Sequence, residues 1–392
     1  MSARLLLRWG IRLNPLEDGT SKAIVGRCAW DTIKIRLEIT ELSLSLMTTN
    51  ESPKGLRLKA SRVEIDWHPG LPIFSCEPFL KAVSDEYGWL GGFTEGGTLR
   101  CALPYTIIRK PGLRMVRFRV ETIPFREELC IEEEKSFLNS AVEYFRSARM
   151  DIIIPATTNA IFRTFPDAAV VAPYGTYILD LRPSEESLWN NLHRKHRNNV
   201  RSAIKNGVAI RTGKEYLNTA YEMIRATFQR SKMGFMGFDA FQRYVLSLEE
   251  HVKIMVADCQ GTLQGCAVVP FSKHSAHYVY GGTSPNPITG AMNLLHWEAI
   301  RHFRALGVQR YDFVGVRIDP EKGSKQEGLK MFKSRFGGRL AQGYIWKCSL
   351  RPLKSAAYSV AVRLLKGGDI VDQERHKLAH SNMSAVQNEA HG

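Results

Sequence analysis

The second half of the chain follows a regular order of predicted secondary structure. Apolar runs and alternating stretches predict strands, and apolar residues spaced by three and four predict helices. Residues 177–350 predict a strand, a helix, a strand, two helices, a meander of three antiparallel strands, a helix, and two last strands around a short helix. Residues 62–155 predict a similar but less regular order. We therefore expect a mixed α/β protein of two similar units, each with a largely antiparallel sheet flanked by helices.

Cap and turn residues set the boundaries of several elements. Ser184 predicts the start of a helix that runs to about Lys205, and Gly207 predicts its end. A helix over residues 77–87 is predicted to end at Gly88. Residues 95–97 predict a turn between two strands, because the two glycines there adopt positive φ without a steric penalty.

The ends of the chain differ from this pattern. Residues 353–365 have apolar residues at helical spacing and basic residues at both ends, which predicts an amphipathic helix that docks either on the protein or on a membrane surface. Residues 369–392 predict disorder. We expect four segments: an N-terminal extension without a motif (1–58), a degenerate unit (59–175), a unit that carries the motifs (176–350), and an amphipathic helix with a tail (351–392).

Composition excludes several classes of protein. Of the 392 residues 44% are hydrophobic, which supports a large core and argues against disorder or a fibre. No stretch approaches 18 uninterrupted apolar residues, so we expect a soluble cytoplasmic protein. The seven cysteines are scattered and never spaced C-x-x-C, and His274 and His277 lack a third ligand in the pattern. We therefore expect neither a disulfide framework nor a metal site.

The positive charge is concentrated in the second half. The chain carries a net charge of +15. Residues 177–350 contain 25 basic and 14 acidic residues, whereas residues 1–176 contain 23 and 21, and residues 351–392 contain 6 and 4. A local excess of this size favours partners that bear phosphates, such as nucleotides, tRNA or anionic lipid.

Four ordered segments resemble one family of enzymes. The segments are residues 188–208 with Leu188, Trp189, Lys195, Arg197 and Arg201, residues 280–283 (Tyr-Gly-Gly-Thr), residues 311–316 (Tyr-Asp-Phe-Val-Gly-Val), and residues 328–338 with the pair Phe332-Lys333. Together they resemble the FemAB family of peptidoglycan-bridge aminoacyltransferases, and more broadly the Fem-like and BioF2-like acyltransferases of cell-envelope biosynthesis. The similarity spans roughly residues 62–350.

The resemblance implies a fold of tandem GNAT-like domains, degenerate over residues 59–175 and catalytic over residues 176–350. It also implies transfer of an aminoacyl or acyl group onto an amine of a peptidoglycan or envelope-polysaccharide precursor, which is linked to a lipid or to a nucleotide. No tightly bound cofactor is expected, and the donor substrate is an aminoacyl-tRNA or an acyl-CoA. A lipid-linked acceptor would bring the cytoplasmic protein into peripheral contact with the inner face of the membrane. The oligomeric state stays open.

Lys333 and Asp312 are the candidates for catalysis that the resemblance indicates. Attack of an amine on an ester needs removal of the amine proton and stabilisation of the developing oxyanion, and it needs no protein nucleophile. Lys333 matches the lysine of the family's Phe-Lys motif and would place a cation near the donor's carbonyl or phosphate; the alternative is a solvated helix face. Asp312 would orient or deprotonate the amine, or would pair with an arginine as a structural carboxylate.

Further candidates concern substrate binding. Arg230 and Tyr244 match, at loose spacing, an arginine and a tyrosine that related enzymes use for the precursor's phosphates or peptide. Tyr280, at a strand end, would point into a cleft between the two units or lie in the core. The other candidates lie on neighbouring faces of one predicted helix, a pattern typical both of a phosphate or RNA contact and of a solvated surface. They are Lys195, Arg197 and Arg201.

The loop before the predicted helix over residues 291–306 departs from that of CoA-dependent acetyltransferases. Those enzymes bind pyrophosphate with backbone N–H groups of a glycine-rich loop at a helix N-terminus. Here Pro285 and Pro287 remove two donors, and only Gly290 followed by Ala291 keeps the glycine pattern. The sequence therefore disfavours CoA as the donor.

Three functions remain open. The first is a Fem-like transferase of aminoacyl or acyl groups. The second is an acyl-CoA-dependent N-acyltransferase that acts on an amino sugar in exopolysaccharide biosynthesis. The third is a basic module without catalytic activity that binds nucleic acid or phosphate.

Overall fold

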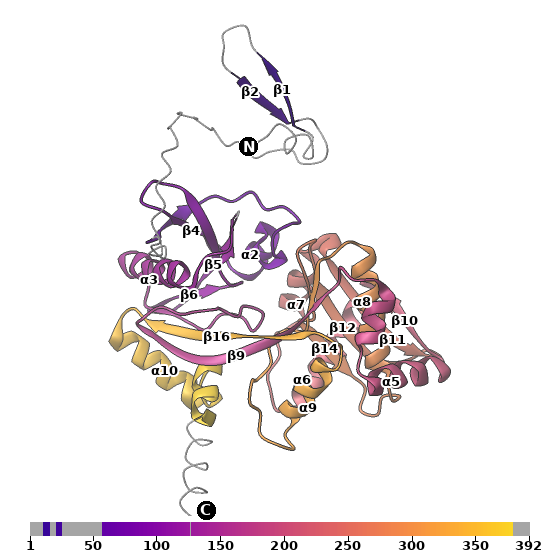
Figure 1. The fold of residues 1–392 in the computed structure, drawn as a ribbon. Coiled ribbons are helices and arrows are strands. Elements are labelled where there is room, and N and C mark those ends of the chain that lie inside the picture. The colour runs from indigo at the N-terminus through magenta and orange to yellow at the C-terminus, as the bar shows by residue number, and fades with distance from the viewer. Residues whose placement is uncertain (1–10, 16–20, 26–56, 126, 379–392) are drawn as a thin grey trace, which may run out of the picture. The chain divides into compact units, whose positions relative to one another are not determined.

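The computed structural model describes residues 11–15, 21–25, 57–125 and 127–378 (Figure 1). Residues 1–52 and 53–392 are two separate compact units. In the first unit, β1 (Ile11–Pro15) and β2 (Ser21–Val25) form an antiparallel hairpin. The rest of the predicted extension, up to residue 56, lies outside the described residues.

The first part of the larger unit is a mostly antiparallel sheet with helices against it. Its strands are β3 (Lys59–Val63), β4 (Glu86–Phe93), β5 (Leu99–Lys110), β6 (Leu113–Phe118), β7 (Ile123–Pro124) and β8 (Ile152–Ile153). Its helices are the short η2 (Ile73–Ser75), α2 (Glu77–Val83) and α3 (Ile131–Ser147). The helix α3 is amphipathic and buries Phe137, Leu138 and Phe145 in the core of this part.

Two long strands connect this sheet to the second part of the unit. β9 (Ala169–Asp180) pairs antiparallel with β16 (Arg339–Ser349) from Ile178 with Arg339 to Ala169 with Cys348. β16 also pairs with β8, and β9 pairs with β15 (Arg310–Asp312). One sheet therefore continues in the order β13-β15-β9-β16-β8-β6-β5-β4-β3. Figure 1 shows β9 and β16 running side by side through the middle of this unit.

The second part has its own sheet in the order β10-β11-β12-β14. The strands of this sheet are β10 (Val208–Thr212), β11 (Val252–Cys259), β12 (Thr262–Pro270) and β14 (Tyr280–Thr283), whereas β13 (Ala276–His277) belongs to the larger sheet. The helices are α4 (Glu185–Asn191), α5 (Arg194–Lys205), η3 (Lys214–Tyr216), α6 (Leu217–Arg230), α7 (Phe238–Leu246), η4 (Glu249–His251), α8 (Ala291–Ala305) and α9 (Lys325–Ser334). After β16 the chain forms α10 (Pro352–Lys366).

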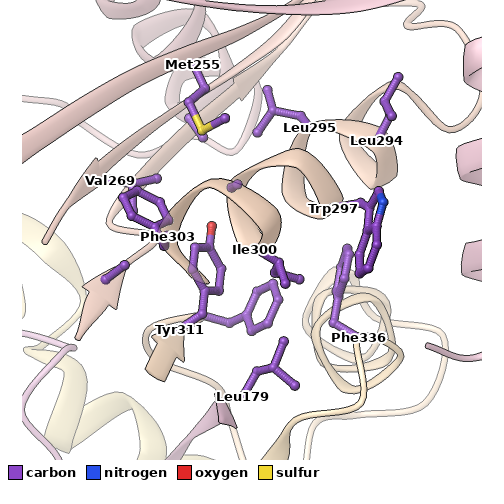
Figure 2. Packing of buried hydrophobic residues seen from close by; sticks show 14 of the residues in the cluster. Leu179, Met255, Val269, Leu294, Leu295, Trp297, Ile300, Phe303, Tyr311 and Phe336 are labelled. Carbon is purple, nitrogen blue, oxygen red and sulfur yellow. The ribbon is translucent and has the colours of Figure 1, made fainter. Parts of the chain in front are cut away.

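The core of the second part is built around α8 (Figure 2). Ile300 and Phe303 of α8 are fully buried against Tyr311 of β15. Phe336, just after α9, stacks on Phe313 with 4.9 Å between the ring centroids. This packing fixes α9 against the end of β15, which is where the candidate site lies.

The predicted fold class, mixed α/β with sheets flanked by helices, is confirmed. Ser184 caps a helix by accepting a hydrogen bond from the N–H of Ser187, and Gly207 follows the end of α5 with φ 77°. However, the single helix predicted from Ser184 to Lys205 is two helices. The chain breaks between α4 and α5 because the N–H of His193 donates to the carbonyl of Arg335, and the His193 side chain caps α5.

Two other boundaries differ from the prediction. The helix α2 ends at Val83, and Gly88 lies inside β4, where an added Cβ would come within 2.8 Å of the Tyr105 hydroxyl. Part of the tail that was predicted to be disordered, residues 370–378, is helical. Val371 is buried in a small apolar cluster there, and Glu374 forms an ion pair of 2.7 Å with Arg317.

Among the described helices, none combines the length and the hydrophobicity needed to cross a bilayer.

We expect the two parts joined by β9 and β16 to unfold together. Phe162 is fully buried between Phe118 and Trp346, with ring centroids 6.1 Å and 5.4 Å away. Phe162→Ala should lower the free energy of unfolding by about 3–5 kcal/mol, because it leaves a cavity beside β16. Denaturant titrations followed by tryptophan fluorescence and by circular dichroism should show the same single unfolding transition. Its midpoint should move to a lower denaturant concentration in Phe162→Ala.

Ile204→Ala on α5 is the control, because this side chain is 57% exposed and its loss should change stability by about 0.5 kcal/mol or less. Two separate unfolding transitions, with only one of the two midpoints changed by Phe162→Ala, would contradict the coupling of the two parts.

Candidate functional site

Two sheets separate within the strand that follows β12. β13 pairs in parallel with β15, whereas β14, three residues later, pairs with β12. The third strand of the predicted meander is therefore divided between two sheets. The chain beyond β15 remains hydrogen-bonded to β9, because Phe313 donates its N–H to the carbonyl of Tyr177. A cluster of buried polar groups lies where these segments part.

Asp312, at the end of β15, is buried and surrounded by donors. The Thr176 hydroxyl and the N–H of Val314, at 2.7 Å, both donate to Oδ1. His277 Nδ1 lies 3.6 Å from Oδ2. Burial acts to raise the pKa of Asp312, but the contacts with His277, Thr176 and Val314 outweigh it and leave the pKa below its usual range. Asp312 is therefore an ionised group that holds the following residues in place.

Val314 and Gly315 adopt left-handed backbone conformations, with φ of 52° and 33°. This conformation is unusual for a β-branched residue and costs conformational energy. Two side chains stabilise this conformation. Asp312 accepts the N–H of Val314, and the ammonium of Lys333 donates to the carbonyls of Val314 and Gly315, at 2.8 Å for Gly315. Strain of this kind persists where surrounding groups determine it, and such places are often functional.

Lys333 reaches this turn from the last residues of α9. Burial lowers the pKa of its ammonium to about 8, and the nearby charge of Asp312 opposes this fall. An ammonium has three hydrogens, and the carbonyls of Val314 and Gly315 use two of them. The structure thus brings Lys333 and Asp312, both predicted from the sequence, into one site.

A chain of side-chain hydrogen bonds leads away from Asp312. His277 Nε2 lies 2.8 Å from Ser275 Oγ, which lies 2.9 Å from His274 Nδ1, and His274 Nε2 contacts the guanidinium of Arg310. Because Arg310 can only donate and burial lowers the pKa of His274 to about 3, we assign His274 as neutral with its hydrogen on Nδ1. Ser275 then accepts from His274 and donates to His277, which leaves the Nδ1 hydrogen of His277 facing Asp312.

Two charged residues of the first part lie within electrostatic reach of predicted site residues, Glu121 of Asp312 and Arg119 of Tyr280. Glu121, just after β6, is half-buried as a residue and lies within electrostatic reach of Arg310 and Asp312. Removal of its carboxyl from water raises the pKa of Glu121, and a hydrogen bond from its own backbone and the charge of Arg310 oppose that rise.

Arg119 is the second of these residues. It is buried, its Nε donates to Thr106 Oγ1 at 2.8 Å, and burial together with Arg117 lowers its pKa to about 9. Sequence reasoning missed Glu121 and Arg119, because a lone charged residue after a strand matches no motif.

The remaining single candidates lie around β14. Tyr280 is half-buried near Arg119, and burial raises its pKa to about 12. Tyr244 lies in the core with its ring centroid 5.9 Å from that of Tyr280, and its hydroxyl has no hydrogen-bond partner among the described residues. Arg230 is exposed at the end of α6 and donates to the carbonyl of Thr283 at 2.6 Å. Arg230 therefore ties α6 to β14.

The basic residues predicted on one helix all lie on α5. Lys195 and Arg201 are exposed, and Arg201 lies over the ring of Trp189, 5.4 Å from its centroid. Arg197 donates to the carbonyl of Asn190 at 2.6 Å. On the inner side of the same helix, buried His196 contacts the carbonyl of Phe332 at 3.0 Å, next to Lys333. The helix α5 is thus anchored to α9 and presents its cations outward.

The start of α8 is tightly enclosed. Gly290 has φ 90°, and an added Cβ would lie 2.1 Å from the carbonyl oxygen of Asn199 on α5. The preceding loop uses its own amides, because the N–H of Ile288 donates to the Gln264 side chain and the N–H of Ser284 donates to the Gln264 carbonyl. These amides are not available to an anion bound at this helix end.

A cavity of about 480 Å³ lies at the ends of β9 and β15, lined by Arg182, Arg310 and Arg339 among others. Arg310 thus connects this basic cavity to the hydrogen-bonded chain that ends at Asp312. Among the residues that the structure describes, no group of three His, Cys, Asp or Glu side chains could bind a metal ion.

Comparison with known proteins supports this view of the second part. Residues 194–327 match the family model described as acetyltransferase (GNAT) domain. The crystal structure of FemX is 15% identical in sequence, and the match covers 74% of this chain and 95% of that one with a TM-score of 0.55. No curated protein matches the sequence.

Two further solved structures match more weakly. One is the C-terminal domain of a putative lysylphosphatidylglycerol synthetase from Agrobacterium fabrum, with 14% identity, 71% and 89% coverage and a TM-score of 0.44. The other is a tandem GNAT protein from the clavulanic acid biosynthesis pathway, with 14% identity, the same coverage and a TM-score of 0.43. Residues 194–327 are therefore similar to a GNAT acetyltransferase domain, and the chain has a FemX-like fold.

Proposed function

We propose that this protein transfers an aminoacyl or acyl group from an activated donor onto an amine of a peptidoglycan or envelope-polysaccharide precursor. The observation that carries the proposal is the ammonium of Lys333, which is held beside ionised Asp312 on the strained turn at Val314 and Gly315. The GNAT domain match supports acyl transfer as the reaction class. We assign the cation that stabilises the oxyanion to residues 176–350, and we treat residues 59–175 as a degenerate domain that supplies one further group to the same site.

In this reaction the amine nitrogen attacks the donor's carbonyl carbon, and the bond from that carbon to the leaving oxygen or sulfur breaks. Negative charge develops on the carbonyl oxygen in between. The third hydrogen of Lys333 would stabilise this oxyanion. A half-buried cation whose ammonium is largely removed from water is effective here, because less water screens it.

The attacking amine must also lose a proton. Asp312 is a poor acceptor, because its pKa is lowered and its oxygens already receive other donors. Glu121 is better suited, since its raised pKa makes it a stronger base. We therefore assign Glu121 as the general base and Asp312 as a positioning residue that sets the turn bound by Lys333.

We propose aminoacyl-tRNA as the donor. Gln264 engages two amides before α8, those of Ser284 and Ile288, and Asn199 of α5 lies close to Gly290, which argues against binding of a CoA pyrophosphate at the start of that helix. The cations Lys195, Arg197 and Arg201 on α5 would contact the donor's phosphates, while Arg230 and Tyr280 would line the acceptor's path. An acyl-CoA-dependent N-acyltransferase for exopolysaccharide amino sugars is the alternative enzyme, and a basic binding module is the alternative without catalysis.

Lys333→Gln should lower kcat about 10²–10³-fold, because the oxyanion loses its cation. The measurement is mass-spectrometric detection of an acylated nucleotide-linked peptidoglycan precursor, with aminoacyl-tRNA or acyl-CoA offered as the donor. Lys322→Gln in the exposed loop before α9 is the matched control and should retain activity. Transfer at the wild-type rate by Lys333→Gln would refute the role of Lys333, and absence of transfer from either donor would refute the function.

The pH dependence of kcat should show two limbs. Activity should rise with pH as Glu121 deprotonates, at a pH above that of an ordinary glutamate, and should fall as Lys333 loses its proton near pH 8. Glu121→Gln should lower kcat about 10²–10⁴-fold and remove the acid limb. Glu128→Gln, an exposed residue of the same segment, should leave both limbs unchanged. An acid limb that persists in Glu121→Gln would assign the base elsewhere.

Charge reversal on α5 separates the donors. Arg197→Glu with Arg201→Glu should weaken binding of aminoacyl-tRNA and reduce the slope of log affinity against log salt by about 1–2, because two phosphate contacts are lost. Binding of an acyl-CoA, measured by calorimetry, should change little. An unchanged salt slope would show that α5 does not contact the donor.

A further inference from the structure

The helix α10 is amphipathic, and its apolar face points away from the protein. Toward the protein, Ser355 Oγ donates to the carbonyl of Asp151 at 2.9 Å, and Tyr358 packs on the cluster of Met115, Ile152 and Ile154. Lys354 fixes the start of the helix by donating to the carbonyl of Gly112 at 2.7 Å. The small and polar side of α10 is thus the attached side, which is the reverse of an ordinary surface helix.

The opposite side is a continuous apolar stripe. Leu353, Val360 and Leu364 recur at intervals of seven and four residues and are 89%, 58% and 81% exposed. Leu365 beside them is 81% exposed, and the exposed alanines at 356, 357 and 361 fill the stripe between the larger side chains. A single exposed leucine needs no explanation, but an aligned row of them over the length of a helix marks an interaction surface.

The charges around the stripe identify the partner. Residues 351–366 contain four basic residues and no acidic one. Arg363 and Lys366 are exposed at the C-terminal end beside Leu364, whereas Arg351 and Lys354 at the N-terminal end pair with Asp151, at 3.8 Å and 3.2 Å. A second copy of this helix would place these like charges in opposition. A surface of anionic lipid accepts both features, because the leucines enter the acyl boundary while the cations meet the headgroups.

We propose that the exposed face of α10 binds anionic phospholipid and holds the protein in the plane of the membrane–water interface. The contacts with Gly112, Asp151 and the cluster of Met115, Ile152 and Ile154 hold α10 on this part of the protein, as Figure 1 shows, and leave the stripe on its exposed side. This inference rests on α10 alone and does not depend on the proposed reaction.

Sedimentation of the full chain with lipid vesicles tests the proposal. Wild-type protein should sediment with vesicles of equal parts phosphatidylcholine and phosphatidylglycerol, far less with phosphatidylcholine alone, and less as salt is raised. Leu364→Ser with Leu365→Ser should weaken partitioning about tenfold or more, because two exposed leucines are lost to the interface. Arg363→Gln with Lys366→Gln should lose about fivefold per charge on anionic vesicles only.

Ile204→Ser on α5 is the matched control for loss of an exposed apolar side chain and should bind like the wild type. Circular dichroism melting should be unchanged in all variants, because the altered side chains are exposed. Failure of the wild type to bind anionic vesicles, or equal binding by Leu364→Ser with Leu365→Ser, would overturn the proposal. A dimer in light scattering that dissociates in this variant, without any vesicle binding, would assign the face to self-association instead.

Discussion

The pairing of β9 with β16 is the constraint on which the site depends. These strands are far apart in sequence, and their long antiparallel register joins the sheet of the first part to the end of β15. This continuity places Glu121, which follows β6, within electrostatic reach of Asp312 and His277 in the second part. Neither part alone contains the full set of charged groups.

The second feature is how the buried charges are stabilised. Burying an ion is costly unless donors or opposite charges replace water. Asp312 satisfies this requirement with hydroxyl, backbone and imidazole contacts, and Lys333 satisfies it with two carbonyls that a left-handed turn aims at its ammonium. The opposite charges of Asp312 and Lys333 also stabilise each other. The turn, the aspartate and the lysine therefore form one cooperative arrangement. Substitution of one member should disturb the others.

Much of this arrangement could be predicted from local patterns. Helical spacing and glycine positions located α5, α8 and α9, and the motifs around Phe332 and Asp312 located two residues of the site. The left-handed turn at Val314 could not be predicted, because valine disfavours it and long-range contacts impose it. The break before α5 was missed for a similar reason, since it follows from the hydrogen bond between His193 and Arg335.

Other features depend on packing that sequence does not encode directly. The strand predicted at the start of residues 177–350 begins earlier in the structure, at Ala169, because the first residues of β9 gain their strand character from pairing with β16. The amphipathic pattern of α10 was evident, but which side faces the protein depends on what Asp151 and Met115 present to it. Glu121 became visible as a candidate only through its neighbours in space.

A double-mutant cycle on kcat tests the central claim most directly, namely that Glu121 and Lys333 act in one site around Asp312. The rates to compare are those of wild type, Glu121→Gln, Lys333→Gln and the double variant with the same donor and acceptor. Groups that serve one transition state are non-additive, so the double variant should lose clearly less than the product of the two single losses. Losses that multiply, or a single variant with wild-type kcat, would contradict a shared site.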